Sequence, residues 1–458
     1  MSTTTDPTVE QRAEAVADAC RNDVRQMIAA SRQGAVILKA IAGGGKSTFI
    51  TQTVGHVAGE ARVMVAAPTN EQVFALVGSI ARAHPALVLH YVPAKDVELP
   101  AVHLLPNVRV VNAQRARGQR LIVGTLDKLG DAFSRNDLGP TDCLIVDEAY
   151  QADSSRYHRA ADLANVHLLV GDAGQIAPFT TVTEALRWRG LPEDPVRTAV
   201  NVVLDNPAVH TRVHHFPITR RLDARSAEAA RSFYERDHDF EAVVPRGVRS
   251  LTWSGPRPLG ARERQLDDAL SVAGREGFCL LELPAAVTPP VDPEIVQLVA
   301  DLVCRALHPS RPADAVCERH QSGIRLAAHR VAVGASHNDQ VRALRRELAT
   351  RGQHDVTVET ANRLQGLEFD LVIAWHPLSG LHALDSFHLE SGRLCVMATR
   401  HRHACVVVGR AGDRELLEGV PPSGDAWLGR DDEPMLDGWD AHRAFYESLA
   451  PVRRPFDA

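Results

Sequence analysis

The sequence is poor in lysine, has no paired cysteine motif and lacks long apolar runs. No stretch reaches about 18 apolar residues without a charge, so we expect no membrane-spanning helix and no membrane partner. The seven cysteines are odd in number and none forms a C-x-x-C pair, which argues against a disulfide framework or a zinc ribbon. Residues 1–10 are polar and acidic, unlike a signal peptide. These absences together favour a cytoplasmic protein.

The charge balance also excludes a general affinity for polyanions. The 51 basic residues include only four lysines, and 57 acidic residues bring the net charge to −6. Binding to nucleic acid would therefore need a local basic track rather than a field over the whole surface. With 458 residues, 45% hydrophobic and 24% charged, the chain has the composition of an ordinary globular protein with two to four domains.

Short apolar runs alternate with helical patterns along most of the chain. This alternation predicts an α/β fold with parallel sheets flanked by helices. We expect an N-terminal lead and helix at 1–29, a first domain at 30–200, a second domain at 201–412 and a partly ordered tail at 413–458. The apolar runs predicted to be strands are 35–40, 63–67, 121–125, 144–146, 167–170, 330–334, 357–360, 371–374 and 404–408.

The stretch AIAGGGKS, residues 40–47, follows an apolar run and precedes a helical pattern, which is the setting of a phosphate-binding loop. Consecutive glycines let the backbone wrap closely around phosphate oxygens, and the dipole of the following helix adds positive potential. In such a loop Lys46 would contact the β and γ phosphates, while Ser47 would ligate Mg²⁺. The residues expected to bind nucleotide here are Gly43, Gly44, Gly45, Lys46, Ser47 and Thr48.

Two adjacent carboxylates, Asp147 and Glu148, follow the apolar run 143–146. Asp147 can complete the coordination of Mg²⁺, and Glu148 can orient and deprotonate an attacking water. Alone, the pair could equally cap the next helix. Together with the phosphate loop, it predicts a nucleoside triphosphatase that uses ATP and Mg²⁺.

Further segments resemble the motifs of superfamily 1 helicases. VGDAGQI at 170–176 is similar to the third motif of that family, in which the glutamine, here Gln175, senses the γ-phosphate. APTN at 67–70 and Thr125 stand where the family contacts a nucleic-acid backbone. In the second half, TRR at 219–221 resembles the arginine motif of the branch that contains the nonsense-mediated-decay helicases. Its spacing to the following aromatic residues favours Arg220 over Arg221 as the phosphate contact.

Three later segments resemble motifs of the same branch. Residues 331–340, which end in HNDQ, are similar to its strand-then-glutamine segment. Residues 359–370, which contain LQGLE at 364–368, are similar to its fifth motif, and VMATRHR at 396–402 to its sixth. The resemblance covers about residues 30–410. It implies two RecA-like domains with ATP in the cleft between them, and an arginine finger at Arg400.

The resemblance also implies the roles of individual residues. Catalysis would depend on Lys46, Asp147, Glu148, Gln175, Arg220, Arg221 and Arg400. Gly366 and Glu368 would add to the nucleotide site, and Ser47 and Asp147 would hold the metal. Single-stranded nucleic acid would be bound by Pro68, Thr69, Asn70, Thr125 and Gln365.

These expectations describe a motor that moves on single-stranded nucleic acid, with DNA favoured over RNA and a 5′ to 3′ direction. The chain lacks the large inserted domains that usually separate strands in the family. A second hypothesis is therefore a nucleotide-controlled switch, or a subunit of a larger complex that does not unwind nucleic acid itself. A small-molecule kinase built on the same loop is a third hypothesis, which the two arginine motifs disfavour.

Overall fold

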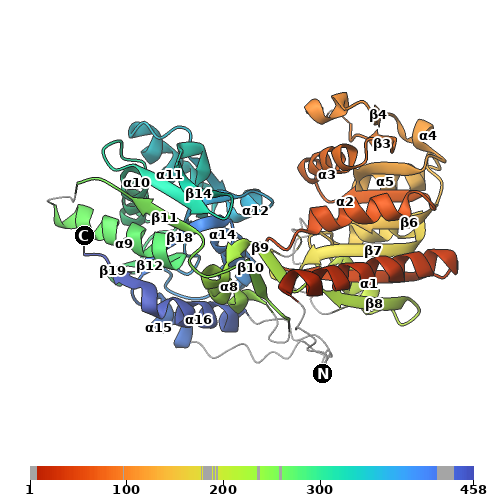
Figure 1. The fold of residues 1–458 in the computed structure, drawn as a ribbon. Helices are drawn as coiled ribbons and strands as arrows, with labels where there is room; N and C mark the ends of the chain where they lie inside the picture. The colour runs from red at the N-terminus through yellow and green to blue at the C-terminus, as the bar shows by residue number, and fades with distance from the viewer. Residues whose placement is uncertain are drawn as a thin grey trace, which may run out of the picture. The chain divides into compact units, whose positions relative to one another are not determined.

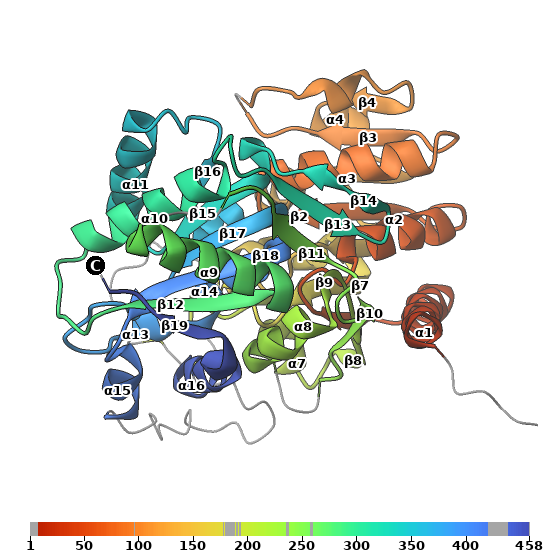
Figure 2. The ribbon, with the colours of Figure 1, turned by 60° about the vertical axis from the view of Figure 1, so that its left-hand side comes forward.

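The computed structural model describes residues 8–457 apart from 96, 177, 179–187, 189–190, 192–193, 235–237, 257–259 and 420–437. Contacts within the chain separate two compact units, residues 1–173 with 177–218 and residues 174–176 with 219–458. Each unit contains one large parallel sheet flanked by helices (Figures 1 and 2). The predicted α/β class, with parallel sheets flanked by helices, is confirmed, and the two units are consistent with the predicted pair of RecA-like domains.

The sheet of the first unit has eight strands, all paired in parallel. The strands β1 and β2 are buried along their whole length, as expected when helices cover both faces. Carboxyl ends of parallel strands meet at one edge, so the loops after β1, β2, β5, β6 and β7 share that edge. In sheet order the strands are β4 (Val108–Val110), β3 (Leu89–Val92), β5 (Leu121–Thr125), β2 (Val63–Ala67), β6 (Thr141–Val146), β7 (Ala164–Asp172), β1 (Gly34–Ala40) and β8 (His210–His215).

Helices form a layer on each face of this sheet. α1 (Val9–Ala29), α2 (Lys46–Val57) and α3 (Asn70–Ala83) pack side by side on one face. The other face carries α5 (Leu126–Ser134), α6 (Ser154–Ala160) and α7 (Ala199–Leu204), with the short α4 (Ala113–Ala116).

The helices α1 and α3 both begin with a capping box. In each, a threonine caps the first turn and a glutamine three residues later returns a hydrogen bond to the threonine backbone: Thr8 with Gln11, and Thr69 with Gln72.

The sheet of the second unit has six parallel strands. Its order is β16 (Thr357–Thr360), β15 (Val331–Ala335), β17 (Phe369–Trp375), β18 (His401–Arg410), β12 (Phe278–Leu283) and β19 (Arg453–Pro455). Two smaller sheets accompany it, β9 (Ile218–Asp223) with β10 (Glu241–Val244), and the antiparallel set β11 (Ser250–Trp253), β13 (Ala313–Cys317) and β14 (His320–Arg325).

The helices of the second unit again lie on both faces of its sheet. The main core is built by α9 (Ala261–Glu276), α10 (Pro293–Ala306) and α11 (Asn338–Thr350) against β12, β15, β17 and β18. On the other side, α14 (Ser391–Ala398) and α16 (Gly438–Leu449) pack together. The remaining helices are α8 (Ala224–Ala230), α12 (Ala361–Leu364), α13 (Ser386–Leu389) and α15 (Asp413–Glu418).

Two of the predicted domain divisions coincide with helix ends, because α1 ends at Ala29 and α15 begins at Asp413. The predicted division between residues 200 and 201 falls inside α7, and that division stays a prediction. Parts of the predicted lead and of the region 413–458 lie outside the described residues. The described part of that last region contains α15, α16 and β19, and β19 pairs with β12 in the sheet. Of the helices in the described ranges, none is both long and apolar enough to cross a membrane.

Candidate nucleotide site and nucleic-acid interface

The loop between β1 and α2 has a backbone that favours glycine. Gly43 has φ 72°, and Gly45, the N-cap of α2, has φ 97°. A Cβ on Gly44 would lie 3.0 Å from the carbonyl oxygen of Ile218 and 3.1 Å from that of Ile41. The tight loop leads into the first turn of α2, whose backbone N–H groups have no carbonyl partners within the helix. Such a helix start attracts phosphate.

The side chain of Lys46 lies between two carboxylates at this loop. Its Nζ is 3.2 Å from Oε1 of Glu148 and 3.8 Å from Oδ2 of Asp172. The carboxylates are close because β6, β7 and β1 are consecutive in the sheet, with Ala40 opposite Asp172 in the register. Sequence reasoning had not assigned a role to Asp172. The available signal was a carboxylate at the end of an apolar strand, two residues before the predicted GQ segment.

Asp147 is 5% exposed, and its Oδ1 accepts a hydrogen bond from the backbone N–H of Glu148 at 2.9 Å. Burial raises the pKa of Asp147 to about 7. The negative charge of Glu148 adds to this rise, and Lys46 opposes it. A cation placed beside such a carboxyl group would favour its ionised form. The environment of Asp147 therefore suits a metal ligand.

Glu148 itself has an unusual backbone conformation. Its φ is 50°, and only Ser31 and Asn136 share a positive φ among the described non-glycine residues. Holding a side-chain-bearing residue in this region costs on the order of 1–3 kcal/mol and is most frequent at functional sites. The turn directs Glu148 back toward Lys46.

The donor set fits Mg²⁺ better than a metal held by protein ligands alone. Ser47 is exposed at the start of α2 and Asp147 is buried after β6. Among the described residues, no group of three or more His, Cys, Asp or Glu side chains could hold a metal. Mg²⁺ typically takes one or two protein ligands and completes its shell with water and phosphate oxygens.

The segment containing Gln175 belongs to the second unit, although β7 just before it belongs to the first. Two glycines permit its close packing there. A Cβ on Gly392 would lie 2.7 Å from backbone atoms of Gln175 and Ile176, and one on Gly174 would lie 2.7 Å from the ring of Tyr234. Gln175 is 9% exposed. Its position is therefore fixed by the second unit, whereas the sequence grouped it with the first.

The two arginines of β9 have different environments. Adjacent residues in a strand point to opposite faces, and here Arg220 is exposed while the side chain of Arg221 is 9% exposed. Nε of Arg221 donates to Oε1 of Glu368 at 2.9 Å, and its Nη1 donates to the carbonyl oxygen of Thr399 at 3.2 Å. The structure thus joins the predicted arginine motif to the fifth and sixth motifs through Arg221.

Glu368 and Arg400 complete this part of the second unit. Burial acts to raise the pKa of Glu368, but Arg221, with help from Arg402 and Arg400, outweighs it and lowers the pKa. Nη1 of Arg402 lies 3.7 Å from Oε2 of Glu368. Arg400 is 2% exposed, and its Nε donates to the carbonyl oxygen of Val396 at 3.2 Å.

Arg249 binds the backbone of β9, the strand that contains Arg220 and Arg221. It was not identified from the sequence. It is 1% exposed, and its guanidinium donates to the carbonyl oxygens of both Arg220 and Arg221. The same group pairs with Glu318, at 2.6 Å and 3.0 Å. Arg249 precedes β11 and Glu318 follows β13, so the small antiparallel sheet holds the backbone of β9 in place.

Replacing Arg249 with alanine is expected to lower the free energy of unfolding by about 3–5 kcal/mol, because Glu318 and two carbonyl groups lose a buried, charged partner. Glu318→Gln keeps acceptor capacity on a side chain that is 35% exposed, and we expect a smaller loss, of about 1 kcal/mol. Urea denaturation of the two variants measures the difference. Equal stability of Arg249→Ala and wild type would contradict this account.

The residues predicted to bind nucleic acid in the first unit follow neighbouring strands. Pro68, Thr69 and Asn70 follow β2, Thr125 ends β5, and Ala67 is opposite Thr125 in the register. The hydroxyls of Thr69 and Thr125 cap α3 and α5 by accepting backbone N–H groups at 3.4 Å and 3.2 Å. These residues therefore share one edge of the sheet, beside the turn containing Asp147 and Glu148.

Gln365 belongs to the second unit, between α12 and β17. Its Nε2 is buried and has no hydrogen-bond partner among the described residues, and the same holds for Oδ1 of Asn70 in the first unit. The next residue, Gly366, has φ 79°, so the turn after Gln365 favours glycine. Buried polar atoms without partners are rare, and a bound ligand is one explanation for them.

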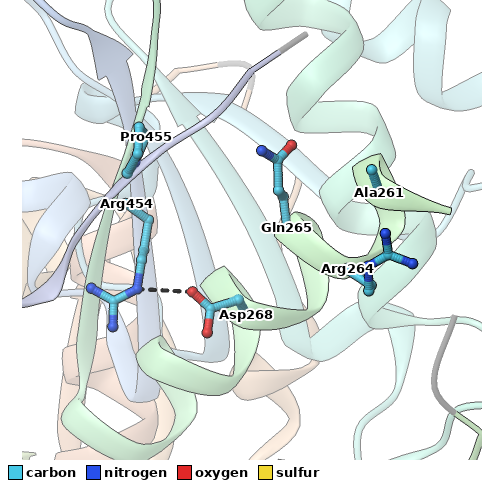
Figure 3. Close-up of a pocket in the computed structure, with 6 residues that line it drawn as sticks. All are labelled: Ala261, Arg264, Gln265, Asp268, Arg454 and Pro455. Atoms are coloured by element: carbon cyan, nitrogen blue, oxygen red, sulfur yellow. Dashed lines mark hydrogen bonds and ion pairs between the residues drawn. The ribbon is translucent and has the colours of Figure 1, made fainter. Parts of the chain in front are cut away.

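A shallow, open hollow of about 300 Å³ lies elsewhere in the second unit, between α9 and β19 (Figure 3). Across it, Nε of Arg454 donates to Oδ2 of Asp268 at 2.8 Å. Its other lining residues are Ala261, Arg264, Gln265 and Pro455. None of the residues predicted to bind nucleotide or nucleic acid lines this hollow.

The two parallel sheets and the loop around Lys46 define the class of this protein, a P-loop nucleoside triphosphatase. Two sequence-family profiles, both described as AAA domain, match residues 19–185 and 297–412. The first match includes Lys46, Asp147 and Glu148, and the second includes Glu368 and Arg400. These two matches to AAA domains support the predicted ATP-hydrolysing, superfamily 1 helicase-like enzyme.

Comparison with curated protein sequences finds no match. Among solved structures, the PRRSV helicase matches with a TM-score of 0.41 and 11% identity, over 84% of this chain and 54% of that one. An arterivirus nonstructural protein 10 helicase in complex with DNA matches with a TM-score of 0.42 and 13% identity, over 86% and 65%. The helicase MrfA bound to DNA and AMPPNP matches with a TM-score of 0.42 and 10% identity, over 91% and 52%. The chain thus spans about half to two thirds of the length of these proteins.

Proposed function

We propose that this protein hydrolyses ATP with Mg²⁺ while bound to single-stranded nucleic acid and moves along the strand. The observation that carries the proposal is the position of Lys46, whose Nζ lies 3.2 Å from Glu148 and 3.8 Å from Asp172 at the start of α2. The carboxylates keep a half-buried cation in place beside a helix terminus that attracts phosphate. A triphosphate would compete with Glu148 for Lys46.

This competition suggests how the chain's own residues act. Lys46 would bind the β and γ phosphates, together with the backbone of residues 43–48. Glu148, released from Lys46, would then accept a proton from the attacking water. Ser47 and Asp147 would hold Mg²⁺, which neutralises charge on the phosphates.

The second unit offers the residues that would sense and stabilise the transferred phosphoryl group. We assign γ-phosphate sensing to Gln175 and charge stabilisation to Arg220 and Arg400. Arg220 is favoured over its neighbour because it is exposed, whereas the side chain of Arg221 is only 9% exposed. In this assignment Arg221, Gly366 and Glu368 shape the site rather than contact phosphate.

We propose single-stranded DNA, ahead of RNA, as the nucleic acid, and 5′ to 3′ as the direction of movement. Thr69, Asn70 and Thr125 would contact the strand in the first unit, and Gln365 in the second. The buried amide atoms of Asn70 and Gln365 support this assignment, because neither has a partner among the described residues.

The proposal is tested by measuring ATP hydrolysis with and without oligonucleotides. Polythymidylate and polyuridylate strands of equal length separate DNA from RNA, and displacement of streptavidin from biotin at either strand end reports the direction. We expect stimulation by the DNA strand and displacement from its 3′ end. A wild-type rate that no single strand changes would refute the role of nucleic acid.

A second candidate is a nucleotide-controlled switch within a larger complex. It is favoured by the small size of the insertion between α8 and α11. Among the described residues, the strands found there outside the main sheet are β10, which pairs with β9, and the small sheet of β11, β13 and β14. Strand-displacement assays separate the candidates. Unwinding by the isolated chain would exclude the switch, and ATP hydrolysis that appears only with a protein partner would support it.

A further inference from the structure

A chain of hydrogen bonds connects the candidate nucleic-acid residues of the first unit with Glu148. It begins at Thr69, which exchanges hydrogen bonds with Gln72 at the start of α3. Nε2 of Gln72 then donates to Oε1 of Gln151 at 3.0 Å, across 79 residues of sequence. The backbone N–H of Gln151 in turn donates to the carbonyl oxygen of Glu148 at 2.8 Å. Thr69 follows β2, and Glu148 and Gln151 follow β6. These two strands are direct neighbours in the sheet.

The direction of each hydrogen bond follows from the first one. The backbone N–H of Thr69 can only donate, so the atom of Gln72 that lies 3.0 Å from it must be the carbonyl oxygen. The amide NH₂ of Gln72 therefore faces Gln151, which has to present its own carbonyl oxygen. As a result the NH₂ group of Gln151 points away from this bond. This nitrogen is buried and has no hydrogen-bond partner among the described residues.

A second buried polar atom without a partner lies in the same region. It is Oδ1 of Asn70, in the first turn of α3 and two residues before Gln72. The NH₂ donor of Gln151 and the Oδ1 acceptor of Asn70 thus lie near the same sheet edge without hydrogen-bond partners among the described residues. Burying each such group without a partner lowers the stability of the protein by about 1–3 kcal/mol. A strand of nucleic acid carries both kinds of partner in its phosphate oxygens, sugars and bases.

We propose that Gln72 and Gln151 are positioning residues that couple strand binding to the orientation of Glu148. The NH₂ group of Gln151 donates to an oxygen of the bound strand, and Gln72 holds the Gln151 amide in the orientation that makes this possible. The backbone N–H of Gln151 is hydrogen-bonded to the carbonyl oxygen of Glu148. Binding of the nucleic-acid strand to Gln151 therefore restricts the turn that carries Glu148. This turn already has the left-handed φ of 50° at Glu148, so small shifts reorient the carboxylate. The inference rests on the proposed function and adds how nucleic acid regulates it.

Two variants break the relay in different ways. Gln151→Leu removes both the carbonyl that accepts from Gln72 and the NH₂ that meets the strand, without adding charge. Gln72→Glu keeps the acceptor for the Thr69 N–H and so keeps the cap of α3. A carboxylate cannot donate to Gln151, however, and the Gln151 amide has to turn its NH₂ toward Glu at position 72 and away from the strand.

The chain contains a matched control for the second variant. Gln11 forms the same capping box with Thr8 at the start of α1, with Thr8 N–H donating to Oε1 of Gln11 at 2.8 Å. Gln11→Glu makes the same chemical change at an equivalent helix position outside the relay. Thermal unfolding of all three variants establishes that they are folded.

The readout is the ratio of ATPase rate at saturating polythymidylate to the rate without it. We expect this ratio to fall about tenfold in Gln72→Glu and Gln151→Leu, a typical size for coupling between sites, and to keep its wild-type value in Gln11→Glu. Using saturating strand removes the effect of weaker binding, which anisotropy of a labelled strand measures separately. A merely structural role would lower both rates together and leave the ratio unchanged.

Three results would overturn the inference. A wild-type ratio in both relay variants overturns the relay alone and leaves the proposed function standing. An equal loss in Gln11→Glu also overturns it, because the effect would then come from the added charge or from the cap. A wild-type enzyme that no single strand stimulates overturns the proposed function, and the relay with it.

Discussion

Replacing Lys46 with alanine is expected to reduce ATP turnover by about 10²–10³-fold, the loss that follows removal of one donor aimed at developing negative charge. Lys46 is the cation at the phosphate loop, and it lies 3.2 Å from Glu148 and 3.8 Å from Asp172. Without it, these carboxylates and Asp147 form an uncompensated cluster that repels a triphosphate. Steady-state release of phosphate measures turnover, and equilibrium binding of a labelled nucleotide measures the loss of affinity.

Two further variants separate binding from chemistry. Glu148→Gln keeps the shape of the side chain and cannot accept a proton, so nucleotide binding should persist while turnover is lost. Lys95→Ala replaces an exposed lysine and should behave as wild type. Full turnover in Lys46→Ala would remove the phosphate loop from the mechanism, and full turnover in Glu148→Gln would remove the proposed base.

Acidification is expected to destabilise the second unit strongly, because it contains three fully buried histidines. Burial lowers the pKa of His401 to about 3 and that of His442 to about 4, and burial together with nearby His442 lowers the pKa of His376. At His401 the neutral tautomer is defined by its partners. Nδ1 donates to the carbonyl oxygen of Ala398 at 2.8 Å, and Nε2 lies 2.9 Å from the hydroxyl of Ser226.

The direction of the effect follows from proton binding. Histidines of the unfolded chain are protonated below about pH 6.5, whereas the buried ones stay neutral until the pH is much lower. The unfolded state therefore binds more protons in the window between about pH 6.5 and pH 4, and stability falls as pH falls through it. Each such histidine contributes about 1.4 kcal/mol per pH unit, so three together give a slope of about 4 kcal/mol per pH unit.

Urea denaturation at several pH values tests this slope, with limited proteolysis identifying the unit that opens. His442→Phe removes one titrating group from the core and should reduce the slope by about a third. His320→Gln, at an exposed position of β14, should leave it unchanged. A second unit that is equally stable at both ends of the window would contradict the prediction.

Much of the fold could be predicted from local sequence because its strands are buried on both faces. The apolar runs 35–40, 63–67 and 121–125 are the strands β1, β2 and β5 of the structure. The strand β12 was not predicted, because its sequence FCLLEL contains a glutamate, a residue type that usually indicates an exposed position. Glu282 is 6% exposed and pairs with Arg453, 171 residues away, so its burial depends on a contact that local sequence does not reveal.

In the candidate site, too, the residues that could be predicted are those marked by a local sequence pattern. Lys46 and Glu148 could be paired from sequence because each follows a strand with a recognisable local pattern. Asp172, Arg249 and Gln151 could not be given roles, because their functions depend on partners in distant segments: Lys46, Glu318 and Gln72. For the two arginines of β9, the spacing to the following aromatic residues favoured Arg220, and the structure adds a physical difference: Arg220 is exposed, whereas the side chain of Arg221 is 9% exposed.

The pairing of β19 with β12 has a practical consequence for anyone who shortens the chain. β19 forms the outermost strand of its sheet, and the following Phe456 is 1% exposed. Truncation before Arg453 would expose the backbone hydrogen-bonding groups of β12 that now pair with β19, and it would also remove the buried side chain of Phe456. An exposed strand edge can pair with the same edge of another molecule. We therefore expect the shortened protein to aggregate on expression.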